Sequence, residues 1–322
     1  LWALPKLDGR LSTRRWQFDW QALRPELRFG AAIFSASTAA NAAWAALPLI
    51  IGAIRGPAAI VPFHIGQKFP LALTAITWRL ADVFFPAASQ QPLTSARGHA
   101  QALLEMSVRW IAVVALPAST VLWILAPNLL QAWLGEVQPE MLLILRLMTV
   151  WALFDSIGAG AYYVLWARNN IRPVLAITSG TALVTVVLTL GLTGPLGAVG
   201  AAIGLAAPTP LAAILLVWGA AHLSDAKPWP LIRASWQGLL APWLACAAVA
   251  AGLAFWLRPQ HWAGTIAVAV PAGAAFLVTL YFTGNREEER HLMASGVTGP
   301  VRLGRSLCRK LAPRRRVHQL RP

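Results

Sequence analysis

The sequence has few charged residues, few cysteines and none of the short motifs of common enzyme classes. Charged residues make up 12% of its 322 residues, whereas hydrophobic residues make up 57% and the mean hydropathy is +0.58. Soluble domains carry about 25% charged residues, so this composition indicates an integral membrane protein. The two cysteines, Cys246 and Cys308, are too few for a disulfide framework or a cysteine-based metal site.

Motifs of nucleotide-dependent and hydrolytic enzymes are also absent. The sequence contains no G-x-x-x-x-G-K-[ST] phosphate loop, no H-E-x-x-H zinc motif, no C-x-x-C pair and no G-x-S-x-G nucleophile elbow. The connections between its hydrophobic runs are too short to fold as domains, since an unassisted domain needs roughly 40 residues. We therefore predict a protein that is not an enzyme, does not hydrolyse ATP itself and holds no cofactor.

Long hydrophobic runs, in contrast, are abundant, and about eight of them approach the ~20 residues that a membrane-spanning helix needs. They are residues 29–54, 57–86, 106–127, 141–167, 172–193, 197–221, 238–257 and 263–283. The sequence therefore predicts an all-α integral membrane protein, a polytopic bundle of about eight transmembrane helices.

Basic residues are distributed unevenly around these runs. Most of the 27 Lys and Arg residues precede residue 29, follow residue 284 or lie in alternate connections, whereas the other connections hold Arg55 and Arg258 alone. The positive-inside rule then places both ends in the cytoplasm, with the protein in the cell (inner) membrane. Because the basic excess lies beside membrane segments, it predicts contact with anionic membrane lipids rather than with nucleic acid.

One hydrophobic run carries four ionisable residues, His64, Lys68, Arg79 and Asp82. At 100° per residue they fall within about 60° of one another, on one helix face. Intramembrane charges usually face a bundle interior or a water-filled cavity, because each costs roughly 2.5–3.5 kcal/mol at the centre of a lipid-exposed helix. Pro70 lies in the same run and predicts a kinked or broken helix beside the charges.

Each member of this stripe also has a structural interpretation. Arg79 and Asp82, three residues apart, can neutralise each other, and His64 can be a neutral hydrogen-bonded residue. Lys68 has no carboxylate three or four residues away, so it needs a partner on another helix or an anionic ligand.

Residues 141–167 contain a second candidate site. Asp155 lies near the middle of this run, and Tyr162, seven residues on, shares its face. Asp155 is a candidate proton or cation site, whereas Arg146 lies about 180° around the helix and cannot pair with it. In the first run, Ser37 and Asn41 lie among many alanines and are interpreted as polar contacts between closely packed helices.

The order of several short motifs resembles one family of transporters. The motifs are DWQALRPELRFGAAIFSAST, IIGAIRGPAAIVPF, ADVFFPAASQQ, LLQAWLGE and GPLGAVGAAIGLAAPTPL. In this order they look like the carboxy-terminal half of polysaccharide (O-antigen type) flippases of the MATE-like multidrug/oligosaccharidyl-lipid/polysaccharide exporter superfamily. The resemblance covers residues 20 to about 222 as a six-helix second lobe, and residues 238–283 match the two extra helices of longer members.

This resemblance implies the domain organisation. It divides the chain into a basic cytoplasmic inter-lobe segment (1–28), a six-helix transmembrane lobe (29–222), an additional helix pair (223–284) and a basic cytoplasmic tail (285–322). An amino-terminal lobe of the same protein is expected upstream, since the sequence starts at Leu1 rather than at Met.

The resemblance also implies a function. Proteins of this kind move polyprenyl-pyrophosphate-linked oligosaccharide across the cytoplasmic membrane by alternating access, and a polysaccharide polymerase is a candidate partner. Lys68, Arg79 and His64 would attract the pyrophosphate in a cavity between the lobes, whereas Asp155, and with it Asp82, would serve as a cavity acid or coupling-ion site. The alternatives are a drug or metabolite exporter of the same superfamily, a membrane glycan polymerase or ligase, and a non-transporting membrane scaffold.

Overall fold

A computed structural model of the chain describes residues 20–82, 97–167, 171–223 and 228–283. Every regular element in these ranges is a helix. In chain order they are α1 (Trp20–Arg55), the short 3₁₀ helix η2 (Pro57–Ala59), α2 (Ile60–Asp82), α4 (Arg97–Ile124), α5 (Ala126–Leu134), α6 (Pro139–Ala167), α7 (Ile171–Leu196), α8 (Ala198–Ala206), α9 (Thr209–Leu223), α10 (Pro228–Trp236), α11 (Leu240–Leu257) and α12 (Trp262–Thr283). The predicted all-α class is confirmed.

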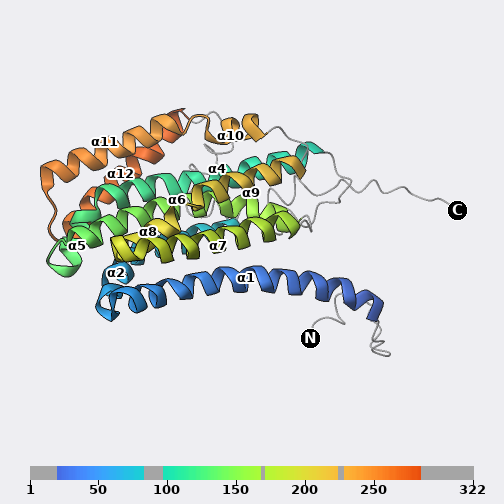
Figure 1. Ribbon diagram of the computed structural model, residues 1–322. Coiled ribbons are helices and arrows are strands. Elements are labelled where there is room, and N and C mark those ends of the chain that lie inside the picture. The colour runs from blue at the N-terminus through green and yellow to red at the C-terminus, as the bar shows by residue number, and fades with distance from the viewer. Residues whose placement is uncertain (1–19, 83–96, 168–170, 224–227, 284–322) are drawn as a thin grey trace, which may run out of the picture.

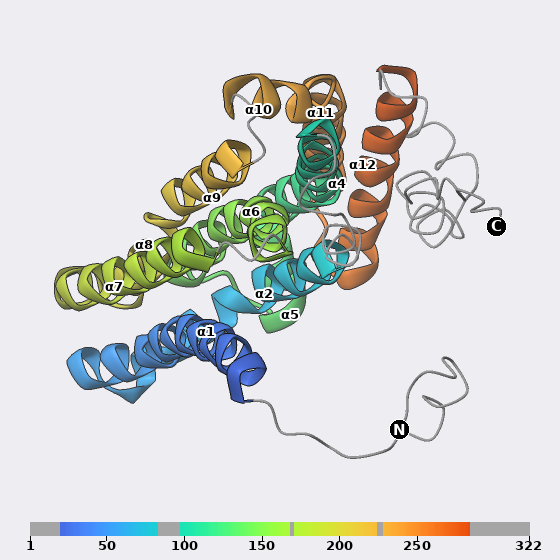
Figure 2. The ribbon, with the colours of Figure 1, turned by 90° about the vertical axis from the view of Figure 1, so that its right-hand side faces the viewer.

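The long helices run side by side in one bundle (Figure 1). In the view turned by 90°, α2 and α6 lie in the middle, α1 and α7 form one side, and α11 and α12 form the other (Figure 2). The most extensive contact between two helices is that of α2 with α6, and the pair α11–α12 packs on α4. The short helices α5 and α10 lie at opposite ends of the bundle (Figure 1).

Most of the predicted membrane segments match helices closely. Seven helical segments in the described ranges are long and apolar enough to cross a membrane: Ser37–Arg55, Leu104–Ile124, Pro139–Trp166, Arg172–Leu196, Ala198–His222, Leu240–Leu257 and Trp262–Thr283. The eighth predicted segment forms α2. This helix is long enough to cross a membrane, but it is less apolar than the other seven. Its polar and charged residues lower its hydropathy, although one face of the helix packs against α6. The chain is a polytopic helical membrane protein.

Some boundaries differ from the prediction. The helix α1 begins at Trp20, well before residue 29. Its apolar, membrane-spanning part begins only at Ser37, so the first turns precede that part. The predicted domain division stays a prediction, and its two basic end segments lie largely outside the described residues.

The helix α2 continues through Pro70 without a break, so the predicted break is wrong, whereas the predicted kink stays a prediction. Pro70 is buried within α2 and has no backbone donor. The carbonyl of Gly66, four residues earlier, therefore lacks its usual partner in the helix. Pro62 lies in the first turn, where a missing donor costs little. Packing against α6 keeps α2 helical, but Pro70 leaves a weak point in the middle of its hydrogen-bond ladder.

Arg109 is buried within α4, in the predicted membrane segment 106–127. Its Nη1 donates to the carbonyl oxygens of Ser235 (3.4 Å) and Gln237 (2.7 Å), at the end of α10. Charge-assisted hydrogen bonds are stronger than neutral ones. Arg109 therefore fixes the connection between α10 and α11 against α4.

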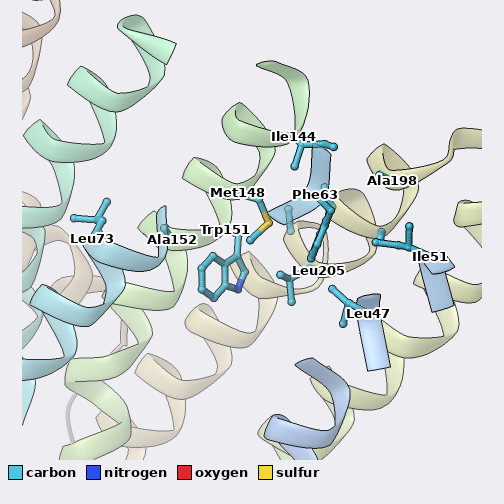
Figure 3. Packing of buried hydrophobic residues seen from close by; sticks show 13 residues of the cluster. Leu47, Ile51, Phe63, Leu73, Ile144, Met148, Trp151, Ala152, Ala198 and Leu205 are labelled. Atoms are coloured by element: carbon cyan, nitrogen blue, oxygen red, sulfur yellow. The ribbon is translucent and has the colours of Figure 1, made fainter. Parts of the chain in front are cut away.

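The largest hydrophobic core lies where α1, α2, α6 and α8 meet (Figure 3). Leu47 and Ile51 of α1 and Phe63 of α2 are almost fully buried there, against Ile144 and Met148 of α6. Because this core joins α1, α2 and α6, it holds in register the helices that carry the ionisable residues predicted from the sequence.

Close packing of α7 against α8 depends on glycine. A Cβ atom built on Gly200 would lie 2.2 Å from the carbonyl oxygen of Leu192, and one on Gly204 would lie 2.8 Å from the backbone nitrogen of Thr189. Both contacts involve backbone atoms, which cannot move as a flexible side chain can. The small residues of α8 thus allow the backbones of the two helices to approach closely.

We predict that Gly200→Ala destabilises the bundle, by about 1–3 kcal/mol, the usual cost of overpacking a tight contact. Gly191→Ala is the matched control on α7, because nothing lies within 4 Å of its Cβ position. The measurement is the thermal unfolding midpoint of both variants in one detergent. Equal midpoints for the two variants would contradict the close contact of α7 and α8.

Candidate functional site

A cavity of about 310 Å³ opens between α1, α6, α7, α8 and α9, with one side chain contributed by α2. Its polar lining residues are Ser37, Asn41, Asp155, Thr178, Thr181, Thr185 and Thr209. Its aromatic lining residues are Trp44, Trp78, Trp151, Phe154 and Tyr162. Among the described residues that line it, none is basic and Asp155 is the one carboxyl group.

Asp155 lies on the cavity face of α6, together with Gly158 and Tyr162. The spacing of Asp155 and Tyr162 predicted a shared face, and this arrangement is confirmed. The side chain of Asp155 accepts a hydrogen bond of 2.7 Å from the indole Nε1 of Trp78 on α2. An indole N–H can only donate, so this contact is strongest when the carboxyl group is ionised and unoccupied.

Arg146 lies away from this cavity, as the helical geometry predicted. Its guanidinium carbon is 5.6 Å from the centre of the Trp123 ring, on α4. This distance is within the range of a cation–π contact, so Arg146 meets another helix and leaves Asp155 without a charge partner on α6.

Ser37 and Asn41 were interpreted as contacts between packed helices, but both line the cavity. The Ser37 hydroxyl donates to the carbonyl oxygen of Phe34 in its own helix (3.0 Å). Asn41 is exposed on α1, so its amide is available to the cavity as donor and acceptor. The spacing alone could not separate these uses, because both require a polar face on a small-residue helix.

The predicted stripe on α2 lies on a different surface. His64, Lys68 and Arg79 are exposed, whereas the opposite face of α2 packs into the bundle. The amide Nε2 of Gln67 donates to Nδ1 of His64 at 2.5 Å, which agrees with the interpretation of His64 as a hydrogen-bonded residue. The described part of the chain thus leaves the basic face of α2 uncovered.

Arg79 and Asp82 form an ion pair at the end of α2, with 3.5 Å between Nη1 and Oδ2. The Arg79 side chain is 88% exposed and that of Asp82 is 41% exposed. Such an exposed pair contributes less than about 1 kcal/mol. Asp82 also accepts a hydrogen bond from the hydroxyl of Tyr163 on α6, so it is fixed to the end of the α2–α6 contact and does not line the cavity.

An aromatic cluster from α2 and α6 lies between the two carboxyl groups. Trp78 packs edge-to-face against Tyr162 and Tyr163, with ring centres 5.5 and 5.7 Å apart. Trp166 contacts the same two tyrosines at 5.6 and 5.9 Å. We call Trp78, Tyr162, Tyr163 and Trp166 the aromatic cluster. Aromatic pairs at such distances add about 0.5–1.5 kcal/mol each beyond the area that they bury.

Sequence patterns offered little indication of Trp78 and Tyr163. Tryptophans near membrane boundaries are usually interfacial anchors, and Trp78 lies next to Arg79 near the end of its segment. The adjacent pair Tyr162–Tyr163, two helical turns beyond the acidic mid-span residue, was the available signal. The partner of each tyrosine could be recognised only once α2 had been placed against α6.

The described part of the chain is thus a polytopic helix bundle, with a cavity that contains one carboxyl group and with an exposed basic face on α2. Residues 11–142 match the model of the family described as "Polysaccharide biosynthesis protein". The fold matches the solved structure titled "Lipid II flippase MurJ, inward closed conformation", with a TM-score of 0.65 and 12% sequence identity. The match covers 86% of this chain and 58% of that one. No curated protein matches the sequence.

The family match over residues 11–142 agrees with the predicted resemblance to polysaccharide flippases, and the structural match agrees with the predicted fold. At 12% identity the structural match shows the shared fold alone. The chain spans 58% of the length of the MurJ structure.

Proposed function

We propose that the chain is the second lobe and the extra helix pair of a transporter for polyprenyl-pyrophosphate-linked oligosaccharide. The transporter moves this lipid from the cytoplasmic to the outer leaflet of the cell membrane by alternating access, and it catalyses no covalent reaction. The uncovered basic face of α2 carries the proposal, because its cations have no cover within the described chain. The family match to polysaccharide biosynthesis and the flippase fold support it.

Lys68 is the residue best suited to attract the pyrophosphate. It is exposed in the middle of α2, and an ammonium group there needs an anionic ligand or partner. Arg79 and His64 extend the same face, although the pair with Asp82 partly neutralises Arg79. The attraction must stay moderate, because the lipid has to leave on the other side.

Asp155 serves as the site of a coupling proton or monovalent cation. It is the one carboxyl group among the described residues that line the cavity, and no basic side chain there neutralises it. Ionisable residues within membrane-spanning helices often mark ion or proton pathways. The substrate face and the coupling site therefore lie on different surfaces of the α2–α6 pair.

We further propose that the full-length protein contains an amino-terminal lobe, which covers the basic face of α2 and completes the substrate cavity. Both ends of the chain then lie in the cytoplasm, beside anionic lipids and within reach of a polysaccharide polymerase. An even number of spans, with α2 included, satisfies the charge distribution.

The cavity itself favours a second candidate, the export of a small organic cation. An acid surrounded by Trp44, Trp78, Trp151 and Tyr162 is suited to a cationic guest. In this alternative the basic face of α2 contacts lipid headgroups or a partner helix.

The sidedness of the lipid-linked oligosaccharide separates the two candidates. In cells that lack the full-length gene, we expect this lipid to accumulate on the inner leaflet, where a lectin added outside cannot bind it. The full-length protein should restore binding. Accumulation on the outer leaflet would indicate polymerisation or ligation instead. Unchanged sidedness together with faster uptake of cationic dyes would support the cation exporter.

A further inference from the structure

The aromatic cluster connects two carboxyl groups that lie on different surfaces. Trp78 donates to Asp155 in the cavity, and its ring packs against Tyr163. The Tyr163 hydroxyl in turn donates to Asp82, which is paired with Arg79. Each link in this series is a direct contact between α2 and α6, or within the end of α2.

The first link depends on what occupies Asp155. A free carboxylate accepts a charge-assisted bond from the indole, and this bond loses about half its strength when the carboxyl group is neutral. A monovalent cation on the carboxylate would also repel the N–H group of Trp78. The described cavity lining contains no other titratable group except Tyr162. A change in the charge of Asp155 is therefore the change in the cavity that acts on the Trp78 hydrogen bond.

The end of α2 has the means to respond. The bond of 2.7 Å between the hydroxyls of Thr77 and Ser156 joins α2 to α6 beside Asp155, and Pro70 interrupts the hydrogen-bond ladder of α2. Because one backbone hydrogen bond is missing at Pro70, the second half of α2 is less firmly tied to the first half, and the Thr77–Ser156 bond is the fixed point beside which Trp78 and Asp82 can shift. Two distant sites are coupled when a contact of one site differs between its empty and its occupied state.

We propose that Trp78 is a positioning residue that couples cation occupancy of Asp155 to the Arg79–Asp82 pair at the end of α2. With Asp155 free, Trp78 is held, and Tyr163 keeps Asp82 in place. With a proton or sodium ion on Asp155, Trp78 is released, the cluster loosens, and Asp82 no longer holds Arg79 in its present position. This inference rests on the proposed cation site. It adds that occupancy of this site controls the position of the Arg79 side chain on the substrate face.

Coupling of this kind is reciprocal. Because the Trp78 bond stabilises the free carboxylate, Trp78 competes with the cation. Trp78→Phe removes the indole N–H and keeps an aromatic ring, so it should tighten sodium or proton binding at Asp155 by about 10-fold. Damage to the site would weaken binding, so the direction of the change distinguishes coupling from a merely structural role.

The test uses the purified full-length protein in detergent. Hydrogen exchange of a peptide covering residues 76–82 is followed while sodium is varied at fixed pH, with choline chloride holding the ionic strength, and while pH is varied without sodium. Sodium binding is measured in parallel by calorimetry, and proton uptake with a pH indicator. The two arms identify which cation acts.

We expect the wild-type peptide to exchange about 5-fold faster when Asp155 is occupied. Asp155→Asn should remove the response together with cation binding, and Trp78→Phe should remove the response while binding tightens. Trp44→Phe is the matched control, because Trp44 lines the same cavity but packs on Trp151. It should keep the response.

A wild-type peptide that ignores both cations although Asp155 binds one would overturn the coupling and leave the proposed cation site intact. The absence of cation binding at Asp155 would overturn both. A response that persists in Trp78→Phe would also overturn the coupling. If Trp78→Phe also lowers the protection from hydrogen exchange in α11 and α12, the variant has destabilised the whole bundle. The coupling is then tested with Tyr163→Phe instead. Loss of its response with normal cation binding supports the proposal, and an unchanged response overturns it.

Discussion

Asp155→Asn abolishes the dependence of transport on the coupling cation and lowers the rate of flipping by about 10-fold or more, within the range of typical coupling energies. Asparagine keeps the shape of the side chain and an oxygen that can accept the bond from Trp78, but it carries no charge and binds no proton. The effect is large because no other described carboxyl group lines the cavity. Flipping of fluorescent lipid-linked oligosaccharide in proteoliposomes, with and without a sodium or pH gradient, measures it.

Glu140→Gln is the control for this prediction. Glu140 lies on the same helix, is exposed near its first turn, and lies outside the cavity lining. Its neutralisation should leave both the rate and the gradient dependence unchanged. A wild-type gradient response in Asp155→Asn would remove the coupling role from Asp155, although the fold and the family resemblance would stand.

Lys68→Gln weakens the apparent affinity for the lipid-linked oligosaccharide by about 10-fold, because a charge-assisted contact to the pyrophosphate is lost. Lys68 is exposed and, unlike Arg79, has no carboxylate three or four residues away. The same proteoliposome assay, run over a range of substrate concentrations, separates a change in KM from a change in the maximal rate. Higher salt should weaken the wild type more than the variant.

Two control variants separate the effect of the lost charge from that of the changed side chain. Lys68→Arg keeps the positive charge and should retain most of the affinity. Ala72→Gln places a polar amide one turn further along the same exposed face and should have little effect. A similar loss in Ala72→Gln would attribute the effect to a polar change on that face. Unchanged transport in Lys68→Gln would show that the pyrophosphate does not meet this residue.

The membrane helices could be predicted closely because each hydrophobic run is long enough to fix its own structure. In lipid, backbone groups must be satisfied internally, so an apolar run of about 20 residues has little choice except a helix. The polar segment around Lys68 and Arg79 was also predicted as a helix, although its composition alone does not mark it as a span. The break that was predicted at Pro70, as the alternative to a kink, was wrong, because packing against α6 keeps the helix continuous.

The sequence predicted less of the candidate site than of the helices. Helical periodicity was sufficient to place His64, Lys68 and Arg79 on one face, and Asp155 with Tyr162 on another. It could not show that these faces belong to different surfaces, or that Trp78 and Tyr163 link Asp155 to Asp82. Periodicity describes one helix at a time, whereas both links cross from α2 to α6.

By itself, the sequence determined an all-helical membrane protein, the positions of most of its spans, and the face of each helix on which the ionisable residues lie. These properties follow from local hydropathy and a fixed angle per residue. The tertiary structure alone decided that Asp155 lines a cavity with Ser37 and Asn41, and that no described residue covers the basic face of α2. The reason is that a cavity is formed by the packing of several helices, and no single helix contains the information that places its neighbours.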